Sequence, residues 1–115
     1  MLFGVNTMLS GATADTGKQY SQGIELAVND INSKGGVRIG STTYLLKPDV
    51  CDNQSTAPQA VQCGHRLAER DNVNVMMVPL SAAALALEGF NVQDKFLIIA
   101  NAGASNITTQ HNPLV

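Results

Sequence analysis

Small polar residues follow the apolar runs of this sequence, and their placement suggests a binding surface. The run 97–100 gives way to Asn-Ala-Gly-Ala-Ser-Asn at 101–106, and another run ends at Leu80, directly before Ser81. Small residues let backbone N–H groups approach a bound molecule, and a helix beginning at Ser81 would direct further N–H groups at an anion. A carboxylate is the guest that this chemistry favours. Ordinary strand-to-helix turns also use Ser and Gly, so both interpretations stay open at this point.

The segment 11–18 resembles a phosphate-binding P-loop only in part. Its glycines, Gly11 and Gly17, are separated by five residues rather than four, and Gln19 stands where a magnesium-holding Ser or Thr is needed. No Gly-x-Gly-x-x-Gly follows the first apolar run, which argues against a dinucleotide site. We therefore expect neither a nucleotide triphosphatase nor a dinucleotide-binding enzyme.

No set of residues forms a recognisable catalytic motif. His65 falls within a helical pattern and His111 near the end of the sequence, and neither has a neighbouring nucleophile signature. Asp49 and Asp52 flank Cys51, where we expect a solvated loop with side-chain turns rather than an acid pair. Ser81 and Ser105 lack the Gly-x-Ser-x-Gly setting of a hydrolase nucleophile. The sequence predicts no enzymatic activity, no cofactor and, apart from a pair of cysteines, no metal site.

Composition narrows the class of protein. The 115 residues are 44% hydrophobic and 14% charged, which is typical of one globular domain. The net charge of −2, with basic residues scattered, argues against nucleic-acid binding. No apolar stretch approaches the ~18 residues of a membrane span, and no signal peptide is visible. Cys51 and Cys63 leave a disulfide, two buried thiols and a metal pair open.

Alternating apolar runs and amphipathic patterns predict an α/β fold. Near-continuous apolar runs, typical of buried parallel strands, cover 2–8, 42–49, 73–80 and 96–101. Helical patterns cover 17–34, 56–70 and 81–90, with Ser55 or Thr56 and Ser81 as N-caps and Gly35-Gly36 as a C-cap. Residues 37–39 form a short strand that turns into the second main strand. This order predicts a three-layer, doubly wound, mostly parallel sheet of the Rossmann-like or flavodoxin-like kind.

The order of segments resembles a known family of binding proteins. The block "G…G.ELAVNDIN.KGG…G" from Gly17 to Gly40, "D.CD" at 49–52 and "ASN" at 104–106 occur at matching spacing. Together they resemble the extracellular solute-binding proteins of branched-chain amino-acid ABC transporters, the Leu/Ile/Val-binding, type I periplasmic receptors. The resemblance covers Phe3 to about Thr108. It implies a two-lobed receptor that closes on an amino acid or related acid and delivers it to a membrane permease.

The resemblance also implies which residues hold the ligand. In this family, a Ser near the start of the third helix and a small-residue segment after the fourth strand contact the α-carboxylate and α-amino groups. These contacts fall on Ser81 and Ala82, and on Gly103, Ala104 and Ser105. The anchoring Ser of the family aligns with Ala82, one position after Ser81. An aromatic residue common in the first loop corresponds to Thr16, so the preference for a ligand side chain is not carried over.

The sequence departs from the family in its cysteines and in its length. Some members bridge the "D.CD" cysteine to one at the start of the third helix, where this sequence has Ser81. Cys51 therefore pairs with Cys63, or neither pairs. Residues 1–115 correspond to a truncated N-terminal lobe of the longer, two-lobed receptor. We expect weak ligand binding, if any, and self-association through an unpaired sheet edge and exposed apolar surface.

Three function classes remain from the sequence. The first is the solute-binding module of a transporter, located in the periplasm or outside the cell. The second is the same fold used as a sensor, either a receptor ectodomain or an amide-sensing regulator. The third is a small α/β enzyme, which would need a catalytic constellation that the sequence does not contain. The resemblance favours the transporter module.

Overall fold

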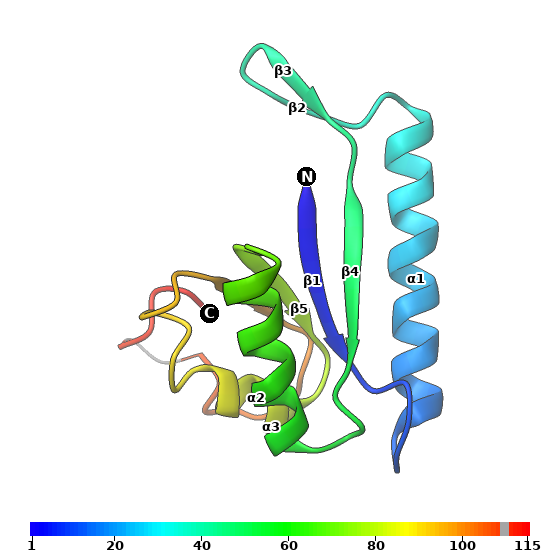
Figure 1. The fold of residues 1–115 in the computed structure, drawn as a ribbon. Coiled ribbons are helices and arrows are strands. Elements are labelled where there is room, and N and C mark those ends of the chain that lie inside the picture. Colours follow the sequence, from blue (N-terminus) through cyan, green and yellow to red (C-terminus); the bar gives the residue numbers. More distant parts are fainter. Residues whose placement is uncertain (109–110) are drawn as a thin grey trace.

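A parallel four-stranded sheet organises the chain (Figure 1). The structure is a computed structural model that describes residues 1–108 and 111–115. The strands lie in the order β4-β1-β5-β6, and every adjacent pair is parallel. Their bounds are β1 (Leu2–Thr7), β4 (Lys47–Asp52), β5 (Val75–Val78) and β6 (Leu97–Ala100). The predicted α/β class with a doubly wound parallel sheet is confirmed.

Helices cover both faces of this sheet, which gives three layers (Figure 1). On one face, α1 (Ala14–Ser33) packs Ile24 and Val28 against Val5 of β1. On the other face, α2 (Ala57–His65) and α3 (Ser81–Leu87) enclose a larger core with β5 and β6. That core includes Leu67, Met76 and Phe96, all fully buried. The alternation of Met76 and Met77 between the two cores follows from the two-residue period of a strand.

Helix α1 begins three residues earlier than the sequence pattern predicts and ends at the predicted glycines. The N–H groups of Gly35 and Gly36 donate to the carbonyls of Asn32 and Ile31, at 3.0 and 2.9 Å. Gly35 has a φ of 101°, a conformation that disfavours other residues. This pair of bonds is a Schellman motif, which satisfies carbonyls left free at a helix end. The predicted glycine C-cap is confirmed.

The segment 42–49 is not one strand, and this prediction was wrong. β2 (Val37–Ile39) and β3 (Thr42–Tyr44) form a separate antiparallel hairpin outside the main sheet. The second main strand is β4, paired with β1 from Leu2↔Lys47 to Thr7↔Asp52. Pro48 and two aspartates gave β4 the composition of a loop. A proline lacks the N–H of a ladder bond, but β4 lies at the sheet edge, where proline is tolerated.

Helix α2 begins as predicted, with Thr56 as its N-cap. The Thr56 side chain accepts the backbone N–H of Gln59, and Pro58 lies in the first turn. The helix continues into a single π-helical turn, η1 (Arg66–Arg70), which places Leu67 in the core. A π-helical turn interrupts the regular spacing of side chains, so the residues after His65 are displaced relative to a continuous α-helix.

Helix α3 is shorter than predicted, and its cap differs. It ends at Leu87, and residues 88–95 form turns that lead to β6. The N-cap is Leu80, without a side-chain hydrogen bond, so Ser81 is the first helical residue rather than the cap. No helix among the described residues has the length and apolar composition needed to cross a membrane.

The sheet face over β5 and β6 on the α1 side is only partly covered. Leu97 and Ile99 are 36% and 45% exposed there, whereas Ile98 on the opposite face is buried. A cavity of about 430 Å³ opens beside them, lined by apolar side chains that include Phe3, Met77 and Ile99. This surface is an exposed apolar patch on an otherwise ordinary domain.

Candidate functional site

The carboxyl ends of the four parallel strands lie at one edge of the sheet, which we call the carboxyl edge. Four loops leave this edge: 8–13 after β1, 53–56 after β4, 79–80 after β5 and 101–106 after β6. After β1 the chain forms β4 on one side of β1, and it later forms β5 on the other side of β1. Ligands of open α/β sheets bind at such a point of reversal, outside the carboxyl ends of the strands.

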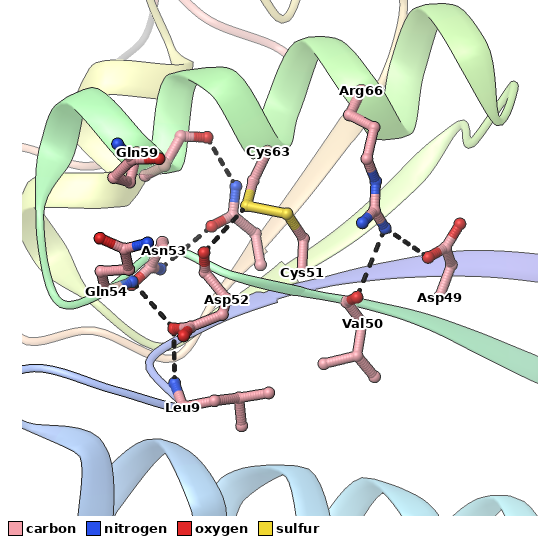
Figure 2. Close-up of a disulfide and its surroundings, with 12 residues drawn as sticks. Leu9, Asp49, Val50, Cys51, Asp52, Asn53, Gln54, Gln59, Cys63 and Arg66 are labelled. Atoms are coloured by element: carbon pink, nitrogen blue, oxygen red, sulfur yellow. Dashed lines mark hydrogen bonds and ion pairs between the residues drawn. A yellow bond between two sulfur atoms is a disulfide. The ribbon is translucent and has the colours of Figure 1, made fainter.

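Asp52, the last residue of β4, links two of these loops. Its Oδ1 accepts the backbone N–H groups of Leu9 and Gln54, both at 2.9 Å (Figure 2). It also accepts the backbone N–H of Ser10 at 3.2 Å. Its Oδ2 accepts the Ser10 hydroxyl at 2.6 Å. Burial raises the pKa of Asp52, but the hydrogen bonds from Ser10, Gln54 and Leu9 outweigh it and lower that pKa below its usual value. The carboxylate therefore holds the loop after β1 against the loop after β4.

A second set of contacts ties the same two loops. The Ser55 hydroxyl accepts the backbone N–H of Thr13 at 3.1 Å and donates to the carbonyl of Ser10 at 2.9 Å. Gly11 has a φ of 86°, and a side chain there would clash with the Gln54 carbonyl. Gly11 is therefore required both by its backbone conformation and by the close approach of the two loops.

Two fully buried asparagines fix the β4 loop to the strand beneath it. Asn53 Nδ2 donates to Asn6 Oδ1 at 3.0 Å, and Asn6 Nδ2 donates to the Ala60 carbonyl at 2.8 Å. Asn53 Oδ1 also accepts the N–H of Ser55. Neither residue was predicted from the sequence. Their only sequence sign is a polar residue within, or directly after, an apolar strand pattern.

Cys51 and Cys63 are joined by a disulfide that connects β4 to α2, with Cα atoms 5.7 Å apart (Figure 2). Beside it, Arg66 donates to the Asp49 carboxylate and to the Val50 carbonyl. Burial raises the pKa of Asp49, and the Arg66 charge acts in the opposite direction. Asp49 and Asp52 thus lie within a strand, so the predicted solvated loop was wrong. The side-chain turn from Asp52 to Gln54 does form, just beyond the strand.

The structure places Ser81 and Ala82 at the carboxyl edge, directly after β5. Ser81 is half-buried and Ala82 is exposed. The first intrahelical N–H donor of α3 is Ala84, which donates to the Leu80 carbonyl at 2.9 Å. The N–H groups of Ser81 and Ala82 therefore have no carbonyl within their own helix to bind.

Gly103, Ala104 and Ser105 lie in the loop after β6, at the same edge. Gly103 and Ser105 are exposed, whereas Ala104 packs against the core. A side chain at Gly103 would meet no atom of the described chain within 4 Å, and its φ is not positive. Neither packing nor backbone conformation therefore requires glycine at position 103. Open space above Gly103 is what a bound molecule would need.

The two predicted segments come from neighbouring strands. β5 and β6 pair from Val75↔Leu97 to Val78↔Ala100, and the N–H of Asn101 donates to the Val78 carbonyl. Ser81 and the loop 101–106 therefore leave the same edge from adjacent strands. His65 lies apart from them, at the end of α2, with its side chain near Asp94 in the loop before β6.

Sequence comparison assigns this chain to a protein family. The family described as "Periplasmic binding protein" matches residues 3–114. The chain belongs to that family. The resemblance noted from the order of segments is confirmed.

The names of individual relatives agree with this assignment. An "Amino acid binding protein" of Pseudomonas aeruginosa is 29% identical over 107 residues, which cover 92% of this chain and 27% of that protein. "Leu/Ile/Val-binding protein homolog 7" of Brucella abortus is 39% identical over 64 residues, or 56% of this chain and 15% of that protein. The chain thus spans less than a third of the length of these relatives.

Solved structures show the same fold. The branched-chain amino acid binding protein LivJ of Streptococcus pneumoniae, in complex with isoleucine, superposes with a TM-score of 0.84 at 24% identity, over 93% of this chain and 30% of that one. An ABC-transporter solute-binding protein of Rhodopseudomonas palustris, in complex with 3,4-dihydroxybenzoic acid, gives 0.82 at 27% identity, over 99% and 30%. Both similar structures hold small organic acids.

Proposed function

We propose that this chain is part of one lobe of an ABC-transporter solute-binding protein, and that its carboxyl edge holds one side of a small carboxylate ligand. The ligand class is a branched-chain amino acid or a related acid. The observation that carries this proposal is that Ser81–Ala82 and residues 103–105 follow the carboxyl ends of two adjacent strands, β5 and β6. Glycine at position 103, which nothing in the described chain requires, supports the same interpretation.

Each of these residues has a distinct role in the proposal. Ser81 and Ser105 present hydroxyl groups to the ligand carboxylate, and the free N–H groups at the start of α3 add further donors. Ala82 and Ala104 have small side chains and Gly103 has none, so the ligand can approach the backbone at these positions. The loops after β1 and β4, fixed by Asp52 and Ser55, form the adjoining wall.

A single lobe leaves its ligand open to water on one side. Polar groups that remain hydrated in the complex contribute little net affinity, so we expect this chain alone to bind in the millimolar range, on the order of 4 kcal/mol. In the complete protein, a second lobe encloses the ligand, and a membrane permease receives it. That protein works in the periplasm or at the outer cell surface, and residues 1–115 form a single domain that corresponds to a truncated N-terminal lobe of it.

Ligand analogues test this proposal directly. In saturation-transfer NMR, the chain should bind isoleucine about tenfold or more tightly than isoleucinol, which lacks the carboxylate. The variant Ser105→Ala should lose most of that preference. The control Ser41→Ala, in the exposed turn between β2 and β3, should keep it. Equal binding of the acid and the alcohol would contradict the proposal.

A further inference from the structure

Three side chains of types that can bind a metal ion lie close together near the end of α2, away from the carboxyl edge. His65 ends α2, Glu69 lies in η1 and Asp94 lies in the loop before β6. One ligand atom from each lies within 4.8 Å of the others. We propose that this cluster, which we call the His65 cluster, binds one Zn²⁺ ion.

The distances within the His65 cluster suit a tetrahedral ion. His65 Nδ1 lies 2.9 Å from Glu69 Oε1 and 3.6 Å from Asp94 Oδ2. Zinc binds nitrogen and carboxylate oxygen at about 2.0–2.2 Å, so ligand atoms around a tetrahedral ion are about 3.4 Å apart. The two observed distances lie on either side of that value. In the proposed site, the Glu69 side chain, which is 63% exposed, rotates to complete the set of ligands.

Close packing fixes the His65 ring before any ion arrives. Gly64 lets α2 approach α3 and Phe90, because a side chain at Gly64 would clash with Leu87 and Phe90. The His65 ring then stacks on Phe90, with ring centres 4.2 Å apart and planes at 15°. Phe90 is in turn packed edge-on against the buried Phe96. A ligand held on rigid elements loses little freedom when it binds a metal.

Asp94 supplies the independent reason to expect an ion. Its side chain is only 16% exposed, and its Oδ2 atom is buried without a hydrogen-bond partner among the described residues. A buried carboxylate oxygen without a partner is costly. The His65 Nδ1 atom lies 3.6 Å from this oxygen, which is beyond hydrogen-bond distance. A cation between His65 and Asp94 would satisfy this oxygen.

The ligand set selects the metal. One imidazole and two carboxylates form a mixed nitrogen–oxygen site, which zinc accepts and which magnesium and calcium, with their preference for oxygen alone, do not favour. Three protein ligands leave a fourth position for water. The bound ion would tie the loop before β6 to α2. This role is independent of the ligand proposed at the carboxyl edge.

Equilibrium dialysis of the oxidised chain against ZnCl₂, without thiol reductant, tests the site. We expect one zinc per chain, and at least about tenfold weaker binding in His65→Asn and in Asp94→Asn. His111→Asn is the matched control, because His111 is the other histidine of the chain and lies outside the cluster. It should bind zinc as the wild type does. Replacing ZnCl₂ by MgCl₂ should give no saturable binding.

A spectroscopic readout separates a metal site from a simple ion pair. On zinc addition, the ring signals of His65 should shift or broaden in ¹H–¹³C NMR spectra while those of His111 stay in place. Circular dichroism of each variant establishes that it is folded. No saturable zinc binding up to ~1 mM, or unchanged binding in folded His65→Asn, would overturn the proposal and leave an ion pair only.

Discussion

The Asp52 carboxylate accepts the backbone N–H of Leu9 at 2.9 Å, across 43 residues of sequence. This bond joins the ends of β4 and β1 at the carboxyl edge of the sheet (Figure 2). Three further donors converge on the same carboxylate, two from Ser10 and one from Gln54. The wall of the proposed site is therefore built by one acidic side chain that four donors hold in place.

Replacing Asp52 with Asn should destabilise the fold. Loss of charge-assisted hydrogen bonds costs on the order of 1.5–3 kcal/mol in the free energy of unfolding, which urea denaturation followed by circular dichroism measures. Asp30→Asn is the matched control, because Asp30 is exposed on α1 and, among the residues that the structure describes, its carboxylate pairs only with Lys34. It should change the free energy of unfolding by less than about 1 kcal/mol. Equal effects of the two variants would argue against the role assigned to Asp52.

The same carboxylate gives stability a pH dependence. The folded-state pKa of Asp52 lies below its usual value, which is about 4 in an unfolded chain. Its contribution is therefore complete above pH ~4 and is lost as the pH falls through the lower, folded pKa. The difference in unfolding free energy between wild type and Asp52→Asn should shrink as the pH falls below ~4. A difference that grows on acidification would contradict the assigned direction.

The Cys51–Cys63 bridge should stabilise the chain. It closes a loop with a sequence separation of 12. Loops of that length correspond to about 3 kcal/mol in the chain-entropy model. The double variant Cys51→Ser/Cys63→Ser should show a lower melting temperature than the oxidised wild type. A reductant should lower the melting temperature of the wild type and leave that of the double variant unchanged. Mass spectrometry after alkylation without reductant checks that the bond is present, because alkylation adds mass only to free thiols. An unchanged mass of the wild type shows that the two cysteines are bridged.

The exposed apolar patch over β5 and β6 should drive self-association. Ile99 and Leu97 together present an uncovered sheet face beside a cavity of about 430 Å³. Sedimentation velocity of the chain should show dimers or larger species that Ile99→Glu shifts toward monomer. Val92→Glu is the control, because Val92 is similarly exposed (49%) but lies in the turns after α3. A wild type that stays monomeric at high concentration would refute this prediction.

Sequence patterns predicted the parallel sheet and its helices because buried strands and amphipathic helices have clear periods. These patterns gave wrong strand bounds and a wrong helix cap where the residue types are not typical of the element that they form. The second main strand was predicted over 42–49, with Asp49 and Asp52 in a solvated loop, yet the strand that pairs with β1 runs from Lys47 to Asp52. The cap of α3 was misplaced by one residue because a Ser at a first helical turn and a Ser at an N-cap look alike in sequence.

The candidate site was predictable only in part. Small residues after β5 and β6 marked Ser81 and Ser105, since their positions follow directly from strand ends. The wall was not predictable, because it depends on partners far apart in sequence, such as Asn53 with Asn6 and Asp52 with Leu9. The His65 cluster was missed for the same reason: Asp94 approaches His65 only after α2 packs beside the turns that follow α3.

Mapping the ligand contact on the ¹⁵N-labelled chain tests the central claim most directly. Isoleucine added to ~20 mM, several times the expected dissociation constant, should shift the amide signals of residues 81–82 and 103–105. Signals of the wall around Ser10 should move less, and those of α1 beyond its first turn should not move. Shifts confined to the apolar patch around Ile99, or no shifts at that concentration, would contradict a ligand site at the carboxyl edge.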